Sequence, residues 1–555
     1  MPFCIPKLAR RLVVALPIVA AFAAPLSAQP ADTRPVITIA VQQIVTSGAL
    51  EPLREQSNVG ARIFDSIFEN LIEVDKTGDL SLKPGLAESY RRIDPQTIEF
   101  TLRRGVKFHD GREMTAEDVV FTFGRERMWG TGEANPQTSG QPTATLFAQG
   151  AQGATSVPRE AVAIAGRLLP AFGSMEAVGP YTVRYTNRVA DLTLEGRLTR
   201  NGTEIISRAG FQAAENWGAW ARRPVGSGPY RVKEFRPDNI LVLEAHDEYW
   251  GGRPPIRELR FVVVPEIATR VNGLLSGQFD FITDVPPDQF RAIERSARHD
   301  VIGGAILNHR LLVFDKNHPR LQDPRIRRAL THAIDRNLIV EALFQGKTSV
   351  PAGLQWEYYG QMFHADWTVP AFDPALARRL LQEAGYRGEV IPYRVASGYY
   401  TNQVPTAQAL QQMWQAVGLN VQLQMVENWQ QIFDRSNPQN PRAIRDWSNS
   451  APFNDPVSSI VNQHCERGQQ QQAGEWTNAD FNRLCTVLET STNPDERRST
   501  FRRMLEIIER EDPGYTVLHR SVLYFGKRKD IEWKPSPTQA MDFRASNFRI
   551  VPATR

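Results

Sequence analysis

The sequence Arg103–Thr122, RRGVKFHDGREMTAEDVVFT, predicts the end of a strand, a turn and a helix in close succession. Apolar and polar residues alternate over residues 98–102, which is typical of a strand with one buried face. Asp110-Gly111 supplies a tight turn. Thr115 can cap the helix that follows, and Asp118 stands three residues later, at the spacing of a capping box. By periodicity alone, this stretch predicts the strand–turn–helix corner of an α/β protein.

The length and composition of the chain predict a globular protein with more than one lobe. Its 555 residues are too many for one ordinary hydrophobic core, so we expect two or three lobes. Apolar residues make up 41% of the chain and charged residues 23%, a globular balance. The net charge is +4 and falls by three, to +1, without Lys7, Arg10 and Arg11. Nucleic-acid binders concentrate basic residues on one face, so we expect no nucleic-acid partner.

Residues 1–28 have the three parts of a secretory signal peptide. Lys7, Arg10 and Arg11 form the basic part, Leu12–Pro25 is apolar, and Leu26–Ala28 offers a cleavage site before Gln29. The apolar run is shorter than the ~20 residues that cross a bilayer. We therefore expect an exported, periplasmic protein from which residues 1–28 have been removed.

Two of the three cysteines remain after export, namely Cys465 and Cys485. An isolated pair in an oxidising compartment favours a disulfide over two free thiols. The alternative is a metal site that uses His464 and Cys465, but the second closely spaced ligand pair typical of zinc sites is missing. We expect a disulfide, no bound metal and no cofactor.

Three later helices are predicted by an acidic or amide cap followed by proline, which suits the first helical position. They begin at Asp323-Pro324, Asp373-Pro374 and Asn493-Pro494, and the first is expected to run on to Phe344. Gly385 ends the second helix and Pro513 stops the third.

Several motifs together resemble family 5 of the extracellular solute-binding proteins. GVKFHDG…TAEDVVFT is similar to the signature of this family. The other matches are LKPGLAESY at Leu82–Tyr90, PVGSGPY at Pro224–Tyr230 and DPRIRRALTHAIDR at Asp323–Arg336. The matches follow the family's order and cover most of residues 35–525. Members of the family are periplasmic receptors for peptides, nickel, opines and some sugars, and they supply ABC importers.

The resemblance implies an α/β fold like that of the type II periplasmic binding proteins, with two lobes, a hinge and an extra inserted domain. A single continuous sheet would contradict this division. The expected parts are a signal peptide (1–28), lobe I (29–75, 205–295 and 521–555), the extra domain (76–204) and lobe II (296–520).

The sequence offers little sign of catalytic chemistry. There is no H-E-x-x-H motif and no dinucleotide fingerprint. Gly346-Lys347-Thr348 ends like a phosphate loop, but Glu341 occupies the position that requires glycine. Gly226-Ser227-Gly228 lacks the spacing of a nucleophile elbow. We expect a protein that is not an enzyme. A secreted hydrolase that uses a carboxylate pair and a non-transport, chaperone-like binding protein remain as alternatives.

Aromatic residues in predicted loops are the candidate ligand contacts. In this family the ligand is enclosed between two lobes, and rigid aromatic rings give large contact areas at little entropic cost. A core position remains the alternative for each single ring. The candidates are Tyr399, Tyr400, Trp447, Trp356 and Tyr358, with Asp446 as the charged contact.

One position departs from the pattern of the peptide-binding relatives. Those relatives carry an acidic residue three positions after the tryptophan, which pairs with the amino terminus of the ligand. Here that position is Ser450, and counting back from Asp455-Pro456 gives Pro452. The resemblance implies a monomer that delivers a small solute, an oligopeptide or an opine-like conjugate, to ABC permease subunits in the inner membrane. The identity of the ligand and that of the permease stay open.

Overall fold

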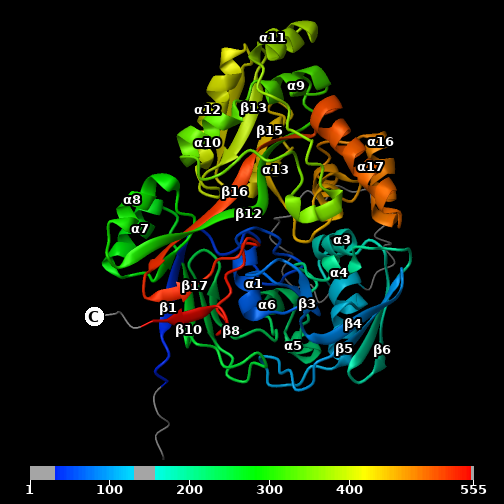
Figure 1. Cartoon of the computed structure of the whole chain (residues 1–555), viewed down its shortest axis with the longest axis vertical. Helices are drawn as coiled ribbons and strands as arrows, with labels where there is room; N and C mark the ends of the chain where they lie inside the picture. The colour runs from blue at the N-terminus through cyan, green and yellow to red at the C-terminus, as the bar shows by residue number, and fades with distance from the viewer. Residues whose placement is uncertain (1–31, 131–156, 552–555) are drawn as a thin grey trace, which may run out of the picture.

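The computed structural model describes residues 32–130 and 157–551, which form two lobes joined by two long strands (Figure 1). These strands are β12 (His299–Phe314) and β16 (Tyr515–Arg528). The predicted signal peptide, residues 1–28, lies outside the described residues. No helix within the described ranges is both long and apolar enough to cross a membrane.

One mixed sheet of ten strands runs through both lobes, in the order β14-β13-β15-β12-β16-β11-β1-β10-β9-β8. In lobe I, β1 lies parallel to both β10 and β11. In lobe II, β13 lies parallel to β14 and β15. The other strands are β1 (Val36–Val41), β8 (Tyr230–Arg236), β9 (Ile240–Ala245), β10 (Glu258–Val263), β11 (Phe281–Ile282), β13 (Ile391–Ala396), β14 (Val421–Val426) and β15 (Ile444–Ser450).

The sheet is continuous because β12 and β16 pair with each other in both lobes. Residues His299–Ala305 pair with one part of β16, and the register then shifts before His309 resumes the ladder. The expectation that a single sheet would be absent is therefore wrong. The hydrophobic cores are nevertheless distinct: one cluster surrounds Ile39 in lobe I, and another surrounds Leu312 in lobe II. Two lobes with separate cores thus share one backbone ladder.

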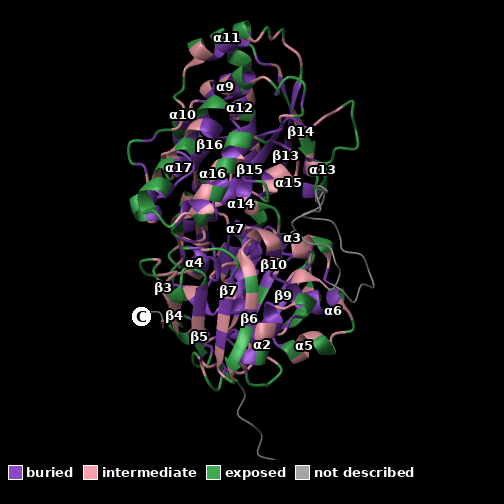
Figure 2. Ribbon diagram, turned by 90° about the vertical axis from the view of Figure 1, so that its right-hand side faces the viewer, coloured by how far each residue is buried: buried purple, intermediate pink, exposed green. Residues whose placement is uncertain are grey.

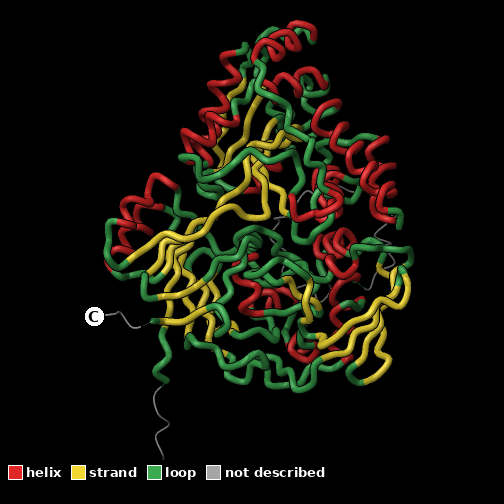
Figure 3. Tube along the Cα trace, viewed as in Figure 1, coloured by secondary structure: helices red, strands yellow, loops and turns green. Residues whose placement is uncertain are grey.

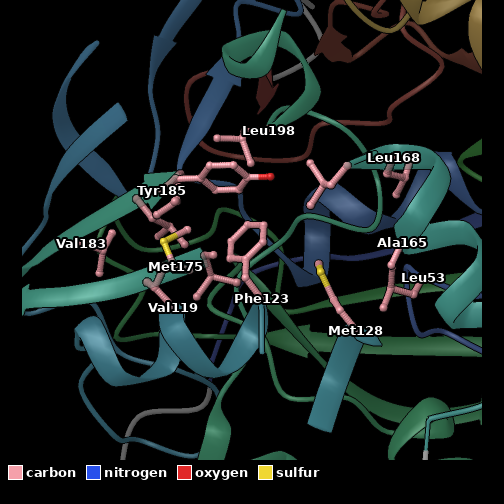
Figure 4. Close-up of a cluster of buried hydrophobic side chains, with 14 of the residues drawn as sticks. Leu53, Val119, Phe123, Met128, Ala165, Leu168, Met175, Val183, Tyr185 and Leu198 are labelled. Carbon is pink, nitrogen blue, oxygen red and sulfur yellow. The ribbon is translucent and has the colours of Figure 1, made fainter. Parts of the chain in front are cut away.

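The segment inserted between the parts of lobe I carries its own four-stranded sheet, in the order β4-β5-β7-β6. A hydrophobic cluster packs under it, in which Phe123 and Tyr185 meet edge to face at 5.9 Å (Figure 4). The cluster also takes in Leu53 and Leu71, so the segment is packed onto lobe I. The strands are β4 (Ala87–Asp94), β5 (Thr97–Leu102), β6 (Phe172–Gly179) and β7 (Thr182–Asn187).

The predicted strand–turn–helix corner is confirmed. Strand β5 buries its apolar face, and α2 (Ala116–Thr122) begins directly after Thr115. The Asp118 carboxylate accepts the backbone N–H of Thr115 at 3.0 Å, which is one half of a capping box. Gly111 has φ of +83°, a left-handed conformation that glycine adopts without strain.

Helices flank the central strands, most clearly in lobe II (Figure 3). Buried residues fill β13 and β15, whereas exposed ones gather on the outer helices and on β6 of the inserted segment (Figure 2). The helices of lobe I and the inserted segment are α1 (Ala61–Ile67), α3 (Arg159–Leu168), α4 (Leu194–Arg197), α5 (Arg208–Ala213), α6 (Trp217–Arg222), α7 (Ile267–Ser276) and α8 (Phe290–Glu294). Those of lobe II are α9 (Pro324–His332), α10 (Arg336–Phe344), α11 (Pro374–Glu383), α12 (Gln403–Ala416), α13 (Trp429–Phe433), α14 (Ile460–His464), α15 (Gln469–Gln472), α16 (Ala479–Thr490) and α17 (Pro494–Glu506). Short strand pairs complete the fold: β2 (Ile72–Val74) with β3 (Leu82–Pro84), and β17 (Ile531–Trp533) with β18 (Phe548–Ile550).

The three predicted caps are confirmed, because Asp323, Asp373 and Asn493 each accept a backbone N–H in the first turn of their helix. The expected single helix up to Phe344 is wrong. It is divided into α9 and α10, since the Asp335 side chain accepts the N–H of Leu338 at 3.0 Å and starts a new helix.

A disulfide joins the end of α14 to α16. Cys465 and Cys485 are bonded to each other and are separated by 20 positions in the sequence. His464, the proposed partner of Cys465 in a metal site, instead stacks on Tyr515 at 4.6 Å.

We predict that the unreduced protein yields a disulfide-linked Cys465–Cys485 peptide pair in mass spectrometry. Reduction should lower the free energy of unfolding by about 3 kcal/mol, because the bond restricts a loop of roughly 20 residues in the unfolded chain. The double variant Cys465→Ser/Cys485→Ser serves as the control and should not respond to reductant. Two alkylatable thiols in the unreduced protein would contradict the assignment.

Two histidines are buried where the long strands pass between the lobes. His309 stacks on Trp356 at 4.0 Å, and its Nε2 lies 2.9 Å from the carbonyl oxygen of Gln355. Burial lowers the pKa of His309 to about 4 and that of His519 to about 3. The positive charge of Arg520 further lowers the pKa of His309, and the positive charge of Arg310 further lowers the pKa of His519.

We predict that His309 and His519 stay neutral in the folded protein at pH 5. An unfolded histidine gains its proton below about pH 6.5, whereas these two do not, so stability falls as the pH drops from 7 to 5. Each should lower the free energy of unfolding by on the order of 2 kcal/mol over that range. Side-chain NMR of labelled histidine can test this, and a normal titration of either ring near pH 6.5 would refute it.

Candidate functional site

A cavity of about 190 Å³ lies where lobe I, the inserted segment and lobe II meet. Its lining is mostly polar, with an aromatic wall on one side. Lobe I supplies Arg54, Gln56, Ser57, Asn58, Ala61, Asp65, Val74, Lys76 and residues 537–540, and the inserted segment supplies Arg167 and Thr199–Asn201. Lobe II and the linking strand supply Leu307, Tyr399, Tyr400, Trp429, residues 447–452, Asn462, Gln463 and Gln469.

Four aromatic rings form the wall of the cavity on the side of lobe II. Trp429 stands nearly perpendicular to Trp447 at 5.4 Å and to Tyr399 at 4.9 Å. Tyr399 in turn meets Tyr400 edge-on at 4.7 Å. The structure thus brings together the predicted candidates Tyr399, Tyr400 and Trp447. Edge-to-face packing holds the rings rigid, so they offer a preformed apolar surface.

Trp429 belongs to this wall, although it is not among the residues predicted from the sequence. This residue opens the short helix α13, where the Asn428 side chain accepts the N–H of Gln431 at 3.1 Å. An asparagine cap immediately before a tryptophan is the only local signal, and it does not distinguish a cavity wall from a core position.

Strand β15 decides which residues of the sequence Arg445–Trp447 reach the cavity. Successive side chains of a strand point to opposite faces, so Arg445 and Trp447 share a face and Asp446 takes the other. The guanidinium of Arg445 lies 4.4 Å from the centre of the Trp447 ring, and Trp447 Nε1 donates to Gln463 Oε1 at 3.0 Å. These contacts fix the orientation of the indole.

The expectation that Asp446 is the charged ligand contact does not fit this geometry. Its carboxylate is 1% exposed and accepts hydrogen bonds from Arg310 at 3.0 Å, Tyr393 at 2.6 Å and Gln403 at 2.8 Å. The guanidinium of Arg310 lies 3.6 Å from the centre of the Tyr400 ring. Asp446 therefore supports the aromatic wall from behind, through Arg310.

Trp356 and Tyr358 also lie outside the cavity lining. Trp356 is buried and stacks on His309, so it is a core residue of lobe II. The Tyr358 hydroxyl donates to the carbonyl oxygen of Leu80 at 3.3 Å, in the turn between β2 and β3 at the start of the inserted segment. Tyr358 thus joins lobe II to the inserted segment.

The charges that line the cavity are mainly positive. Lys76 is paired with Asp65 at 2.5 Å, and Asp65 is the single carboxylate among the described lining residues. Burial lowers the pKa of Arg167 to about 10 and that of Arg200 to about 9, so both remain cationic at neutral pH. A hydrolase with two catalytic carboxylates needs a second acid, which this lining does not supply.

Within residues 32–130 and 157–551, no group of three or more His, Cys, Asp or Glu side chains is arranged to hold a metal ion. What the cavity does offer is stacking surface, amide groups and positive charge. These are the elements of a binding site.

Direct contacts between the lobes close the cavity. The backbone N–H of Asn58 in lobe I donates to the Tyr399 hydroxyl at 3.1 Å, and its side-chain amide donates to Ser448 Oγ at 3.0 Å. On the side of the inserted segment, Arg197 forms an ion pair with Glu489 at 3.0 Å. The structure is therefore a closed arrangement of the lobes.

Comparison with known proteins gives a consistent result. A family profile described as "Bacterial extracellular solute-binding proteins, family 5 Middle" matches residues 81–469. The oligopeptide-binding protein AppA of Bacillus subtilis is 25% identical over 79% of this chain and 78% of its own length.

Two solved structures share the fold. One is a dipeptide-binding protein from Pseudoalteromonas sp. SM9913 in complex with Met-Leu, with a TM-score of 0.79, 21% identity and coverage of 93% of this chain and 100% of its own. The other is MoaA from A. tumefacien R10 in complex with mannopinic acid, with a TM-score of 0.76, 20% identity and the same coverage of both chains.

We predict that Trp447→Ala and Trp356→Ala separate the cavity wall from the core. Both tryptophans belong to the core of lobe II, so each change should cost about 3–5 kcal/mol of stability. Trp447→Ala alone should also weaken solute binding, by on the order of 1–3 kcal/mol. Calorimetric titration of the folded variants measures the difference. Equal affinities in both variants would show that Trp447 is only a core residue.

Proposed function

The chain belongs to family 5 of the bacterial extracellular solute-binding proteins, and from this we propose that it is the periplasmic receptor of an ABC importer. It captures a small solute between its lobes and delivers it to permease subunits in the inner membrane. The observation that carries this proposal is the cavity enclosed between the lobes, with four aromatic rings on one side and positive charge on another. We further propose that the protein acts as a monomer and releases its solute unchanged.

The domain division that fits this function is the one expected from the sequence: lobe I (29–75, 205–295 and 521–555), an extra domain (76–204) and lobe II (296–520). The separate hydrophobic clusters of lobe I and lobe II support it, whereas the ten-stranded sheet that both lobes share counts against it. The hinge would lie at the register shift between Ala305 and His309, where the β12–β16 ladder is interrupted. Rotation there would separate Asn58 from Tyr399 and open the cavity.

The walls of the cavity argue against the usual mode of peptide binding. Ser450 and Pro452 both line the cavity, at the positions where peptide-binding relatives are expected to carry an acidic residue. A free ammonium group enclosed there would lack a counter-charge, which is costly. An opine-like conjugate, whose nitrogen is substituted and whose acid groups are free, fits better than a peptide with a free amino terminus.

We predict that the mature protein binds a compound from a defined panel of Met-Leu, trialanine, mannopinic acid and glucose. A solute at one hundred times its dissociation constant adds about 2.7 kcal/mol to the free energy of unfolding, so the melting temperature rises. Mass spectrometry of the recovered solute should show the unchanged compound. Turnover of the solute would favour the hydrolase, and the absence of any shift across the panel would count against the proposed ligand classes.

A further inference from the structure

We propose that Arg167 and Arg200 together form a subsite for an anionic group, a carboxylate of the captured solute. This inference rests on the proposed solute-binding function and adds the chemical class of the ligand. Both arginines line the cavity, and both come from the inserted segment rather than from lobe II, where the aromatic wall lies.

Local packing brings these two distant positions together. Arg167 lies in the last turn of α3, and Arg200 follows α4 closely. Arg197 Nη1, at the end of α4, donates to the carbonyl oxygen of Leu168 at the end of α3, at 3.2 Å. This bond fastens the two helix ends to each other, so that both guanidinium groups face one cavity.

Neither guanidinium has an acidic partner among the described residues. Arg200 Nη1 donates to the side-chain amide oxygen of Asn462 at 3.3 Å, which is a neutral acceptor. The Nε atom of Arg167 is buried and has no hydrogen-bond partner within the described parts of the chain. The charge of Arg167 also acts on Arg200, whose pKa it lowers further after burial has done so. Two neighbouring cations without a counter-ion are unfavourable, and a bound anion relieves both problems.

Arg197 shows how a structural arginine in the same region differs. It is 3% exposed, and its guanidinium pairs with Asp191 at 2.8 Å and with Glu489 at 3.0 Å. Its charge is thus neutralised by the protein itself. Arg167 and Arg200 lack such acidic partners. This is the arrangement expected of groups whose counter-charge is supplied by a bound ligand.

Lobe II offers the cavity acceptors rather than charges. The side-chain oxygens of Asn449 and Gln469 are buried there without a hydrogen-bond partner within the described residues. They suit N–H or O–H donors of a ligand. The complementary solute is therefore an organic acid that also carries amine or hydroxyl donors and a part that can lie against the aromatic wall.

The subsite also links charge recognition to closure of the lobes. Arg200 belongs to the inserted segment, whereas its partner Asn462 belongs to α14 of lobe II. An anion held by Arg200 and Arg167 would therefore lie between the inserted segment and lobe II. It would contact both of these parts only in the closed form. Such differential contact is what allows a ligand to shift the open–closed equilibrium.

Paired probes test the proposal. Met-Leu, trialanine and mannopinic acid are each titrated as the free acid and as the primary amide against the wild type, Arg167→Gln, Arg200→Gln and Arg291→Gln. Arg291 is exposed on α8, so its variant is the matched control for loss of one positive charge. We expect the wild type to bind at least one acid tenfold or more tightly than its amide. Each cavity variant should lose tenfold or more in affinity for the acid and little for the amide, while the control is unchanged.

The melting temperature of the ligand-free protein gives an independent readout. Arg167→Gln removes a half-buried cation that has no acidic partner among the described residues, so its melting temperature should equal or exceed that of the wild type. Arg197→Met breaks a paired charge and should lower it. A clear loss of stability in Arg167→Gln would make the residue structural and overturn the subsite.

The outcomes also separate this inference from the proposed function. Binding of solutes with no preference for the acid, or a preference that survives both glutamine variants, refutes the subsite and leaves the receptor function standing. Failure of every probe, acid or amide, to bind the wild type counts against the proposed function and against the subsite with it.

Discussion

The antiparallel pairing of β12 with β16 is the constraint on which the rest of the molecule depends. The two strands enter both lobes, so lobe I and lobe II share a backbone ladder while their hydrophobic cores stay apart. Two register shifts interrupt the ladder, one between Ala305 and His309 and one between Arg310 and Leu311. The ladder holds the lobes in fixed register along the strands, and the proposed hinge lies at these irregular positions. A cavity between them, lined from both sides, follows from this connection.

Buried, ion-paired arginines pack against the uncharged aromatic rings that line the cavity. Asp446 holds Arg310, and Arg310 lies against the face of Tyr400. On the other face of the same strand, Arg445 lies over Trp447 and is paired with Glu475 at 2.6 Å. Each ring is thus supported by a guanidinium whose own charge is neutralised. Guanidinium–aromatic contacts of this kind add rigidity as well as binding energy.

The local helices, strands and turns could be predicted from the sequence. The long-range contacts between them could not. The alternation over residues 98–102, the Thr115 cap and the proline-led helices depend on neighbours in the chain, and the structure confirms them. Tyr399, Tyr400 and Trp447 could be placed at the cavity through the family resemblance, whereas Asp446 could not be oriented. One strand position turns a side chain from the cavity to the core, and β15 is a strand where the sequence predicts a loop. Arg167 and Arg200 gave no signal, because they meet through the contact of Arg197 with Leu168 and not through any motif.

Asn58 joins the lobes through two neutral hydrogen bonds, one from its backbone and one from its side chain. Such bonds contribute on the order of 1 kcal/mol each, so Asn58 adds a modest preference for the closed form to that of the other contacts between the lobes. A permease that recognises the closed form would then also bind ligand-free receptor. The fraction of ligand-free receptor that is closed depends on the strength of the contacts between the lobes. Stronger contacts between the lobes would raise this fraction, and more permease complexes would then form with a receptor that carries no solute. Selective import of loaded receptor therefore requires that the contacts between the lobes be weak. The bound solute must then supply most of the free energy that favours the closed form.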